Sequence, residues 1–221
     1  MNIAFIGGGA WGTTLAQVVS DNGYDPLIHD IRADAVDAIN SHRHPFFDTI
    51  IPDNVRATTD LSELLGFSDV IVLSVPSKAV RDVLKDVRTH LERPVTVINV
   101  AKGIEPGTSK TTSEIVKEEI PGHLLNGFVA LTGPSHAEEV IRRKLTLLVS
   151  ASEDEELAVK VQHMFANDTY LRVYTSTDLI GSEIAGAAKN AIAVISGACT
   201  GLGLGENARA AVITRGIVEI V

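Results

Sequence analysis

The amino-acid sequence predicts an α/β fold with a doubly wound, mainly parallel sheet, followed by the start of an all-helical region. Short apolar runs alternate with helical patterns over most of the chain, as expected when strands are joined by helical crossovers. Two of the runs, VIVLSV and TVINV, are continuously apolar and β-branched, which is typical of strands covered on both faces. A glycine-rich segment, GGGAWG, separates the first apolar run from the first helical pattern.

Strands and helices are expected in regular alternation up to about residue 176. The apolar runs predict strands over 2–6, 26–29, 69–75, 95–100, 128–131, 145–151 and 170–174. The helical patterns between them cover 11–21, 32–40, 77–91, 110–119, 135–143 and 154–165.

The pattern changes after this point, and the change predicts two domains. Residues 1–176 form the α/β domain, and residues 177–221 form the first part of a helical substrate domain. Its two helices, 178–200 and 207–221, are joined by the glycine-rich turn GLGLGE. The last helix is still periodic at Val221 and has no stop signal, so we expect this domain to be truncated.

Composition excludes several classes of function. The formal net charge is −9, which argues against binding to nucleic acid, because phosphate-backbone affinity needs clustered cations. A single cysteine, Cys199, favours a reducing, cytoplasmic location. The N-terminal run lacks the positive segment of a signal peptide, and no stretch is expected to span a membrane. The seven histidines show no metal-ligand spacing; His42 and His44 lie in a loop without evident partners, so no metal site is expected.

The glycine-rich segment is the first candidate binding site. Gly7, Gly9 and Gly12 form G-x-G-x-x-G directly after a predicted strand and directly before a predicted helix. The first glycine permits a tight turn, the second lets a pyrophosphate approach the backbone, and the third allows close helix–strand packing. The N-terminus of the helix then offers free N–H groups to the phosphates. This arrangement predicts a Rossmann domain that binds NAD or NADP.

Two residues after the second strand bear on the choice of coenzyme. Asp30 has the spacing of the carboxylate that binds the ribose 2′-OH, which favours NAD over NADP. Arg32 could instead pair with a 2′-phosphate, and Asp30 could simply be a turn or capping residue. Trp11, the single tryptophan, either packs as an ordinary large ring or shields the cofactor.

Four further segments follow the ends of predicted strands or lie in the helical region. Lys102 and Ser135 follow two of the strands, where ligands gather in parallel sheets, and Ser135 is available as a helix N-cap. Lys189 lies in an otherwise nearly uncharged helix among small residues, which either admit a ligand beside the amine or allow tight helix packing. The segments are VPS (75–77), AKGIE (101–105), GPSHAEE (133–139) and EIAGAAKNAIA (183–193).

These segments, together with GGGAWGTTLA and GLGLGENARAAVITRG, resemble the bacterial NAD(P)-dependent sn-glycerol-3-phosphate dehydrogenases, in the same order and along the whole chain. The resemblance implies interconversion of sn-glycerol 3-phosphate and dihydroxyacetone phosphate for glycerophospholipid synthesis, by a cytoplasmic homodimer. It also implies that Lys189 is the proton acceptor and contacts substrate. The other implied substrate contacts are Lys102, Gly133 and Ser135, and the implied cofactor contacts are Ala10, Trp11, Lys102 and Ala137.

The sequence departs from this family at three places and leaves two alternatives open. His136 stands where the family often has an aromatic residue, Asp30 where it commonly has a basic or small one, and the loop 42–54 matches poorly. The first alternative is another lysine-dependent dehydrogenase, acting on 6-phosphogluconate or a 3-hydroxy acid. The second is a nucleotide-binding fragment without turnover, because the family continues beyond this length.

Overall fold

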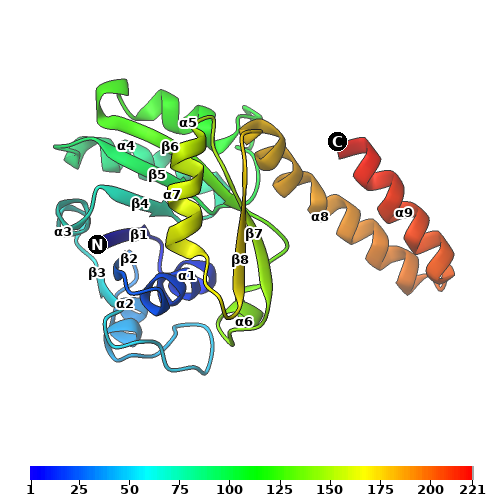
Figure 1. Cartoon of the computed structure of the whole chain (residues 1–221), viewed down its shortest axis with the longest axis horizontal. Helices are drawn as coiled ribbons and strands as arrows, with labels where there is room; N and C mark the ends of the chain where they lie inside the picture. Colours follow the sequence, from blue (N-terminus) through cyan, green and yellow to red (C-terminus); the bar gives the residue numbers. More distant parts are fainter. Residues whose placement is uncertain (221) are drawn as a thin grey trace.

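An eight-stranded sheet forms the centre of this computed structural model, which describes residues 1–220 (Figure 1). The strand order is β3-β2-β1-β4-β5-β6-β7-β8. All neighbouring strands are parallel except β6 and β7, so the predicted doubly wound, mainly parallel sheet is confirmed. The strands are β1 (Asn2–Ile6), β2 (Asp25–His29), β3 (Arg56–Thr58), β4 (Val70–Leu73), β5 (Val95–Asn99), β6 (Leu125–Thr132), β7 (Thr146–Ala151) and β8 (Leu171–Ser176).

Helices cover both faces of the sheet. The helices of the described residues are α1 (Ala10–Asp21), α2 (Ala33–Asn40), α3 (Leu61–Phe67), α4 (Val80–His90), α5 (Thr112–Glu119), α6 (Ala137–Val140), α7 (Glu155–Phe165), α8 (Leu179–Gly201) and α9 (Gly205–Ile220), with short 3-10 turns at Ser77–Ala79 and Gly122–Leu124. The last two, α8 and α9, extend away from the sheet (Figure 1). One hydrophobic cluster joins the sheet to α1 and α7, and a second joins it to α3, α4 and α5. This burial explains why the strand sequences are apolar on both faces.

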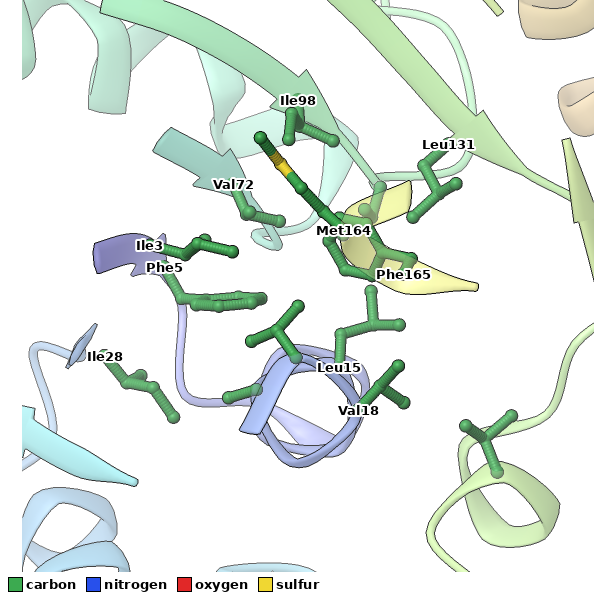
Figure 2. Close-up of a cluster of buried hydrophobic side chains, with 14 of the residues drawn as sticks. Ile3, Phe5, Leu15, Val18, Ile28, Val72, Ile98, Leu131, Met164 and Phe165 are labelled. Carbon is green, nitrogen blue, oxygen red and sulfur yellow. The ribbon is translucent and has the colours of Figure 1, made fainter. Parts of the chain in front are cut away.

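Figure 2 shows the first cluster, where Phe5 of β1 and Leu15 of α1 lie beside Met164 and Phe165 of α7. Phe5, Leu15 and Phe165 are fully buried. Each such side chain contributes roughly 1.5–3 kcal/mol relative to an exposed one. The packing fixes α1, and therefore its N-terminus, against the end of β1.

The order of the strands also places a crevice. The chain runs from β1 to β2 and β3 on one side, and then returns to β4 on the other side of β1. The carboxyl ends of β1 and β4 therefore flank the point where the strand order reverses, which is where open α/β sheets bind their ligands. The glycine loop Gly7–Gly9 lies at this point.

The structure adds two elements that the sequence analysis missed and shortens a third. β3 has only three residues, and α3 has seven, too few for a clear periodic pattern. The side chain of Asp60 caps α3 by accepting from two backbone N–H groups. The helix expected over 135–143 is a single turn, α6, which ends before Arg143 adopts a left-handed conformation (φ 54°).

The change to helices occurs where the sequence placed it, because β8 ends at Ser176 and α8 begins at Leu179. The division into domains at 176/177 stays a prediction. α8 begins beside β6 and β7 and extends away from the sheet. α9 then runs back antiparallel to α8 and packs against it (Figure 1). The turn between them is residues 202–204 of GLGLGE, so α9 begins two residues before the expected position 207.

α8 corrects the expectation that no segment has the length and composition of a membrane span. An 18-residue window of this helix has a mean hydropathy of 1.2, and 6% of the window is buried. By length and composition alone, α8 could cross a membrane. In the described structure its Glu183 and Lys189 side chains bond to the α/β part of the chain.

Candidate active site

The glycine loop has the backbone geometry that the sequence predicts. Gly7 has a φ of 110°, a conformation that favours glycine. A Cβ on Gly12 would lie 2.1 Å from the carbonyl oxygen of Gly7, so only glycine lets α1 start this close to β1. A Cβ on Gly9 would meet no atom within 4 Å. Space for a ligand therefore remains beside Gly9, at a helix start that no side chain caps.

Asp30 holds the glycine loop against the end of β2. One of its carboxylate oxygens accepts from the backbone N–H of Gly8 at 2.7 Å, and the other accepts from the backbone N–H of Arg32 at 2.9 Å. The guanidinium of Arg32 lies 3.4 Å from the second oxygen. Asp30 is 9% exposed, so the protein itself uses most of its hydrogen-bonding capacity. Its role with a ribose stays a prediction.

A cavity of about 440 Å³ opens between the glycine loop and the start of α4. Its size is in the usual range for small-molecule sites. The lining is mostly apolar, with five polar or charged residues among its members: Ile6, Gly7, Gly9, His29, Asp30, Ile31, Arg32, Phe46, Leu61, Ser74, Val75, Pro76, Ala79, Val83 and Asp86. The cavity and the open space beside Gly9 fit a dinucleotide.

The two lysines converge on one loop at the end of β6. The amine of Lys189 donates to the carbonyl oxygen of Gly133 at 2.7 Å, and the amine of Lys102 donates to that of Ser135 at 3.1 Å. Lys189 therefore reaches from α8 towards the sheet, and does not extend into solvent. The two residues come from segments far apart in sequence, and their convergence was not visible from either segment alone.

Both amines have depressed pKa values. Burial lowers the pKa of Lys189, and partial burial together with the charge of Lys189 lowers that of Lys102. A lowered pKa increases the fraction of neutral amine near neutral pH, and a neutral amine can accept a proton. The pair is therefore suited to acid–base chemistry on a group bound beside Gly133.

The loop 133–137 is built differently from the expected helix start. Ser135 does not cap α6; His136 holds the N-cap position without a side-chain hydrogen bond. The Ser135 hydroxyl is buried and has no partner among the described residues. Ala137 is the first residue of α6. The expected N-cap role is wrong, and the hydroxyl lies buried in the loop whose backbone carbonyl oxygens accept from the two lysines.

The small residues of α8 line a second cavity, of about 480 Å³, at the base of Lys189. Ser182, Ala185 and Gly186 all lie in its wall. Lys189 thus has open space beside it, which favours the first of the two alternatives left open for the small-residue face. A ligand in this cavity would lie between α8, α9 and the end of β6.

Trp11 connects the two halves of the site. Its ring lies at the start of α1, and the amine of Lys102 is 5.6 Å from the ring centroid. The indole N–H is buried without a partner in the described structure. The predicted residues thus form two groups in separate cavities: the glycine loop with Asp30 and Arg32, and Gly133 with Lys189. Lys102 links them, because it contacts both Trp11 and Ser135.

The sequence analysis missed two supporting clusters. Glu183 accepts from the backbone N–H and the hydroxyl of Ser113 at 3.0 and 2.6 Å, which ties α8 to α5. Arg81 pairs with Glu105 through two bonds of 2.7 and 2.8 Å and with Glu119 at 2.7 Å, which fixes the loop carrying Lys102. Two features of the sequence could have indicated these clusters: Glu183 is a lone acid in an apolar helix, and Glu105 is the last residue of AKGIE.

Comparison with known proteins identifies one family along nearly the whole chain. The model described as NAD-dependent glycerol-3-phosphate dehydrogenase N-terminus matches residues 2–158, and the C-terminus model matches residues 178–221. The glycerol-3-phosphate dehydrogenase (NAD(P)+) of Acholeplasma laidlawii is 58% identical over 221 residues, covering 100% of this chain and 66% of that protein. A protein of the same name from Streptococcus pyogenes serotype M2 is 47% identical, covering 99% of this chain and 65% of that protein.

Solved structures agree with this match. The crystal structure of a glycerol-3-phosphate dehydrogenase from Coxiella burnetii has a TM-score of 0.89 and 30% identity, covering 99% of this chain and 67% of that chain. The glycerol-3-phosphate dehydrogenase of Plasmodium falciparum gives a TM-score of 0.88 at 25% identity, with coverage of 100% and 65%.

The chain spans about two thirds of the length of its curated relatives. The matched family is not that of a 6-phosphogluconate or 3-hydroxy-acid enzyme. The chain belongs to the NAD-dependent glycerol-3-phosphate dehydrogenase family.

Proposed function

We propose that this protein interconverts sn-glycerol 3-phosphate and dihydroxyacetone phosphate with NAD or NADP. The observation that carries the proposal is the convergence of Lys102 and Lys189 on the loop that begins at Gly133, next to a glycine loop shaped for a pyrophosphate. Names of relatives support the substrate. A role in glycerophospholipid synthesis, a homodimeric state and a cytoplasmic location are parts of the same proposal.

The glycine loop and α1 would hold the pyrophosphate through backbone N–H groups beside Gly9 and Ala10. Trp11 would cover the nicotinamide half and Ala137 would line it, while Asp30 and Arg32 lie towards the adenosine half. When bound, the nicotinamide supplies the acceptor or donor of a hydride.

Lys189 accepts the proton of the substrate hydroxyl in oxidation and donates it in reduction. In oxidation its neutral amine accepts that proton while the carbon-bound hydrogen leaves as hydride. In reduction its ammonium form polarises the ketone and returns the proton. The lowered pKa of Lys189 favours the neutral form needed for oxidation. Lys102 and the unpartnered hydroxyl of Ser135 would bind the oxygens of the phosphorylated substrate.

The coenzyme preference is proposed to be NAD. The carboxylate of Asp30 repels a 2′-phosphate, and Arg32 beside it is already paired with this carboxylate at 3.4 Å. Separate titrations with NADH and NADPH, followed through the fluorescence of Trp11, test this choice, because Trp11 is the single tryptophan. Tighter binding of NADPH would contradict it.

Substitution of Lys189 tests the reaction. We expect Lys189→Ala to abolish oxidation of NADH by dihydroxyacetone phosphate while NADH still binds. Lys160→Ala, a change at an exposed lysine of α7, serves as the matched control and is expected to behave as the unaltered chain. Undiminished turnover in Lys189→Ala would remove this lysine from the mechanism.

A second candidate function is nucleotide binding without turnover. The observation that favours it is the apolar surface of the helical region, where Val194 is 73% exposed and Leu202 is 74% exposed. Exposed apolar side chains that gather on one surface mark a site of interaction with other protein segments. NADH binding with no oxidation by dihydroxyacetone phosphate, in the unaltered chain, would establish this function in place of the first.

A further inference from the structure

α8 carries Lys189, yet little of this helix is buried against the rest of the chain. The residues of α8 that the described structure buries are Leu179, Gly186 and Cys199. Leu179 belongs to the hydrophobic cluster that contains α3, α4 and α5, so the start of the helix is fixed to the core. We propose that Glu183 is a positioning residue, which holds the following turns of α8 where the amine of Lys189 reaches Gly133. The inference rests on the proposed function and extends it to a residue that does not contact substrate.

Glu183, Gly186 and Lys189 lie on one side of α8. They are spaced by three residues, which places them within an arc of about 120° around the helix. The carboxylate of Glu183 accepts from the backbone N–H and the hydroxyl of Ser113 at 3.0 and 2.6 Å. Further along the helix, the amine of Lys189 donates to the carbonyl oxygen of Gly133 at 2.7 Å. Among the described residues, these side-chain hydrogen bonds join α8 to the α/β part of the chain.

Gly186 limits how closely α8 approaches the sheet, but it does not hold the helix there. A Cβ at this position would lie 2.8 Å from the hydroxyl oxygen of Thr132, so α8 passes the end of β6 at a distance that suits glycine. A steric contact opposes approach and gives no resistance to motion away from the sheet. The bonds of Glu183 resist that motion, because a hydrogen bond weakens steeply as its geometry is lost.

A small tilt of α8 would be enough to separate Lys189 from the loop at the end of β6. At a rise of 1.5 Å per residue, Lys189 lies about 15 Å along the helix from Leu179. A tilt of about 10° at Leu179 would therefore move this part of the helix by about 2.6 Å. The bond between Lys189 and Gly133 cannot prevent such a tilt during the reaction, because the same amine must then bond to the substrate hydroxyl. That leaves the bonds between Glu183 and Ser113 to hold the helix.

The surroundings of Glu183 explain which substitutions can test its role. Ser113 lies in the first turn of α5, where backbone N–H groups lack partners within the helix and favour an acceptor. Burial raises the pKa of the Glu183 carboxyl, and the bonds from Ser113 oppose that rise. Glutamine keeps an oxygen that accepts from the backbone N–H, and its amide donates to the hydroxyl oxygen. Glu183→Gln therefore retains both bonds and loses only the charge.

Steady-state oxidation of NADH by dihydroxyacetone phosphate measures the effect on the reaction. We expect Glu183→Ala to lower kcat roughly 10- to 100-fold, because misplacing a reacting group by about 1 Å can cost that much. The affinity for NADH should not change, since the glycine loop lies on other elements. Glu183→Gln should have the kcat of the unaltered chain. Glu156→Ala, at an exposed acid in the first turn of α7, is the matched control and should also leave kcat unchanged.

The pKa of the Lys189 amine provides a second readout that does not need turnover. Competitive acetylation over a range of pH, followed by mass spectrometry of the peptides, measures this pKa in each chain. Burial lowers it in the structure, so an amine released into solvent should return towards its ordinary value. We expect the pKa of Lys189 to rise in Glu183→Ala and to stay low in Glu183→Gln and Glu156→Ala.

Three outcomes would overturn the inference while leaving the proposed function in place. The first is an equal loss of kcat in Glu183→Gln and Glu183→Ala, which would show that the charge is needed and not the bonds. The second is an unchanged kcat and an unchanged Lys189 pKa in Glu183→Ala. The third is a loss of NADH binding in Glu183→Ala, which would indicate general damage to the fold.

Failure of the proposed function would be recognised separately. If the unaltered chain binds NADH without turnover, the proposed reaction is overturned for this chain, and the acetylation experiment still decides whether Glu183 positions Lys189. If Glu183→Ala does not fold, Ser113→Ala takes its place, because it removes the 2.6 Å hydroxyl bond and keeps the backbone N–H. A smaller rise in the pKa of Lys189 is then expected, and no rise would overturn the inference.

Discussion

Acidification should destabilise this protein through His44. Burial lowers the pKa of this imidazole from 6.5 to about 4, since the charged ring would lose its hydration and face no carboxylate. Between these two values the unfolded chain binds a proton that the folded chain does not. The contribution of His44 to the free energy of unfolding is therefore complete above pH 6.5 and is lost as the pH falls towards 4.

The magnitude follows from the two pKa values. Each pH unit between them is worth about 1.4 kcal/mol, which gives about 3 kcal/mol over the whole interval. For a domain whose total stability is roughly 5–15 kcal/mol, this is a large fraction. The contribution at about pH 4.5 should already be reduced by about 2.5 kcal/mol relative to neutral pH.

Urea unfolding at neutral pH and at about pH 4.5 measures this loss, with His44→Asn as the comparison. The variant keeps a hydrogen-bond acceptor but does not titrate in this range, so its stability should fall less on acidification. Other titrating groups, including His29, whose pKa is also lowered by burial, affect both chains equally. If the two chains lost the same free energy between the two pH values, the reasoning about His44 would be refuted.

Two further predictions concern the loop and helix contacts of the site. Gly12→Ala would place a Cβ 2.1 Å from the Gly7 carbonyl oxygen, and we expect it to cost about 1–3 kcal/mol in urea unfolding and to abolish NADH binding. Gly66→Ala, where a Cβ meets nothing within 4 Å, is its control; equal stabilities would contradict the steric argument. Glu183→Ala should cost about 1–3 kcal/mol and speed hydrogen exchange at the start of α8. Ser113→Ala should not add to that loss in the double variant, and additive losses would show that the two residues act separately.

Much of the fold could be predicted from the sequence because local patterns specify it. The strands from β1 to β8, except β3, are apolar runs, and the helices between them have periodic apolar faces. β3 and α3 were not predicted, because three and seven residues are too few to show a hydrophobic periodicity. The helix expected at 135–143 is only the single turn α6, because the helical pattern in the sequence extended into residues that form a turn after it.

The candidate site divides in the same way. The glycine loop could be predicted from the sequence because its chemistry depends on neighbouring backbone positions. The close approach of Gly12 to Gly7 is set within this short segment and not by distant parts of the chain. The role of His44 could not be predicted, because its ring contacts Ala10 and Thr14 of α1, from which β2 and α2 separate it in the chain. These contacts correct the expectation that His44 has no partners. Asp30 was chosen by its spacing, and its role with a ribose stays a prediction. The sequence did not reveal that its carboxylate accepts from the backbone N–H of Gly8.

The sequence by itself indicated the mainly parallel sheet class, the glycine loop and the family, because each depends on a local pattern or on short segments in a fixed order. Only the tertiary structure decided the order of the strands, the contacts of Lys189 with Gly133 and of Lys102 with Ser135, and the contact of His44 with the start of α1. Such contacts join positions far apart in the chain, and their geometry is set by how helices pack on the sheet. A one-dimensional pattern carries no distance between such positions.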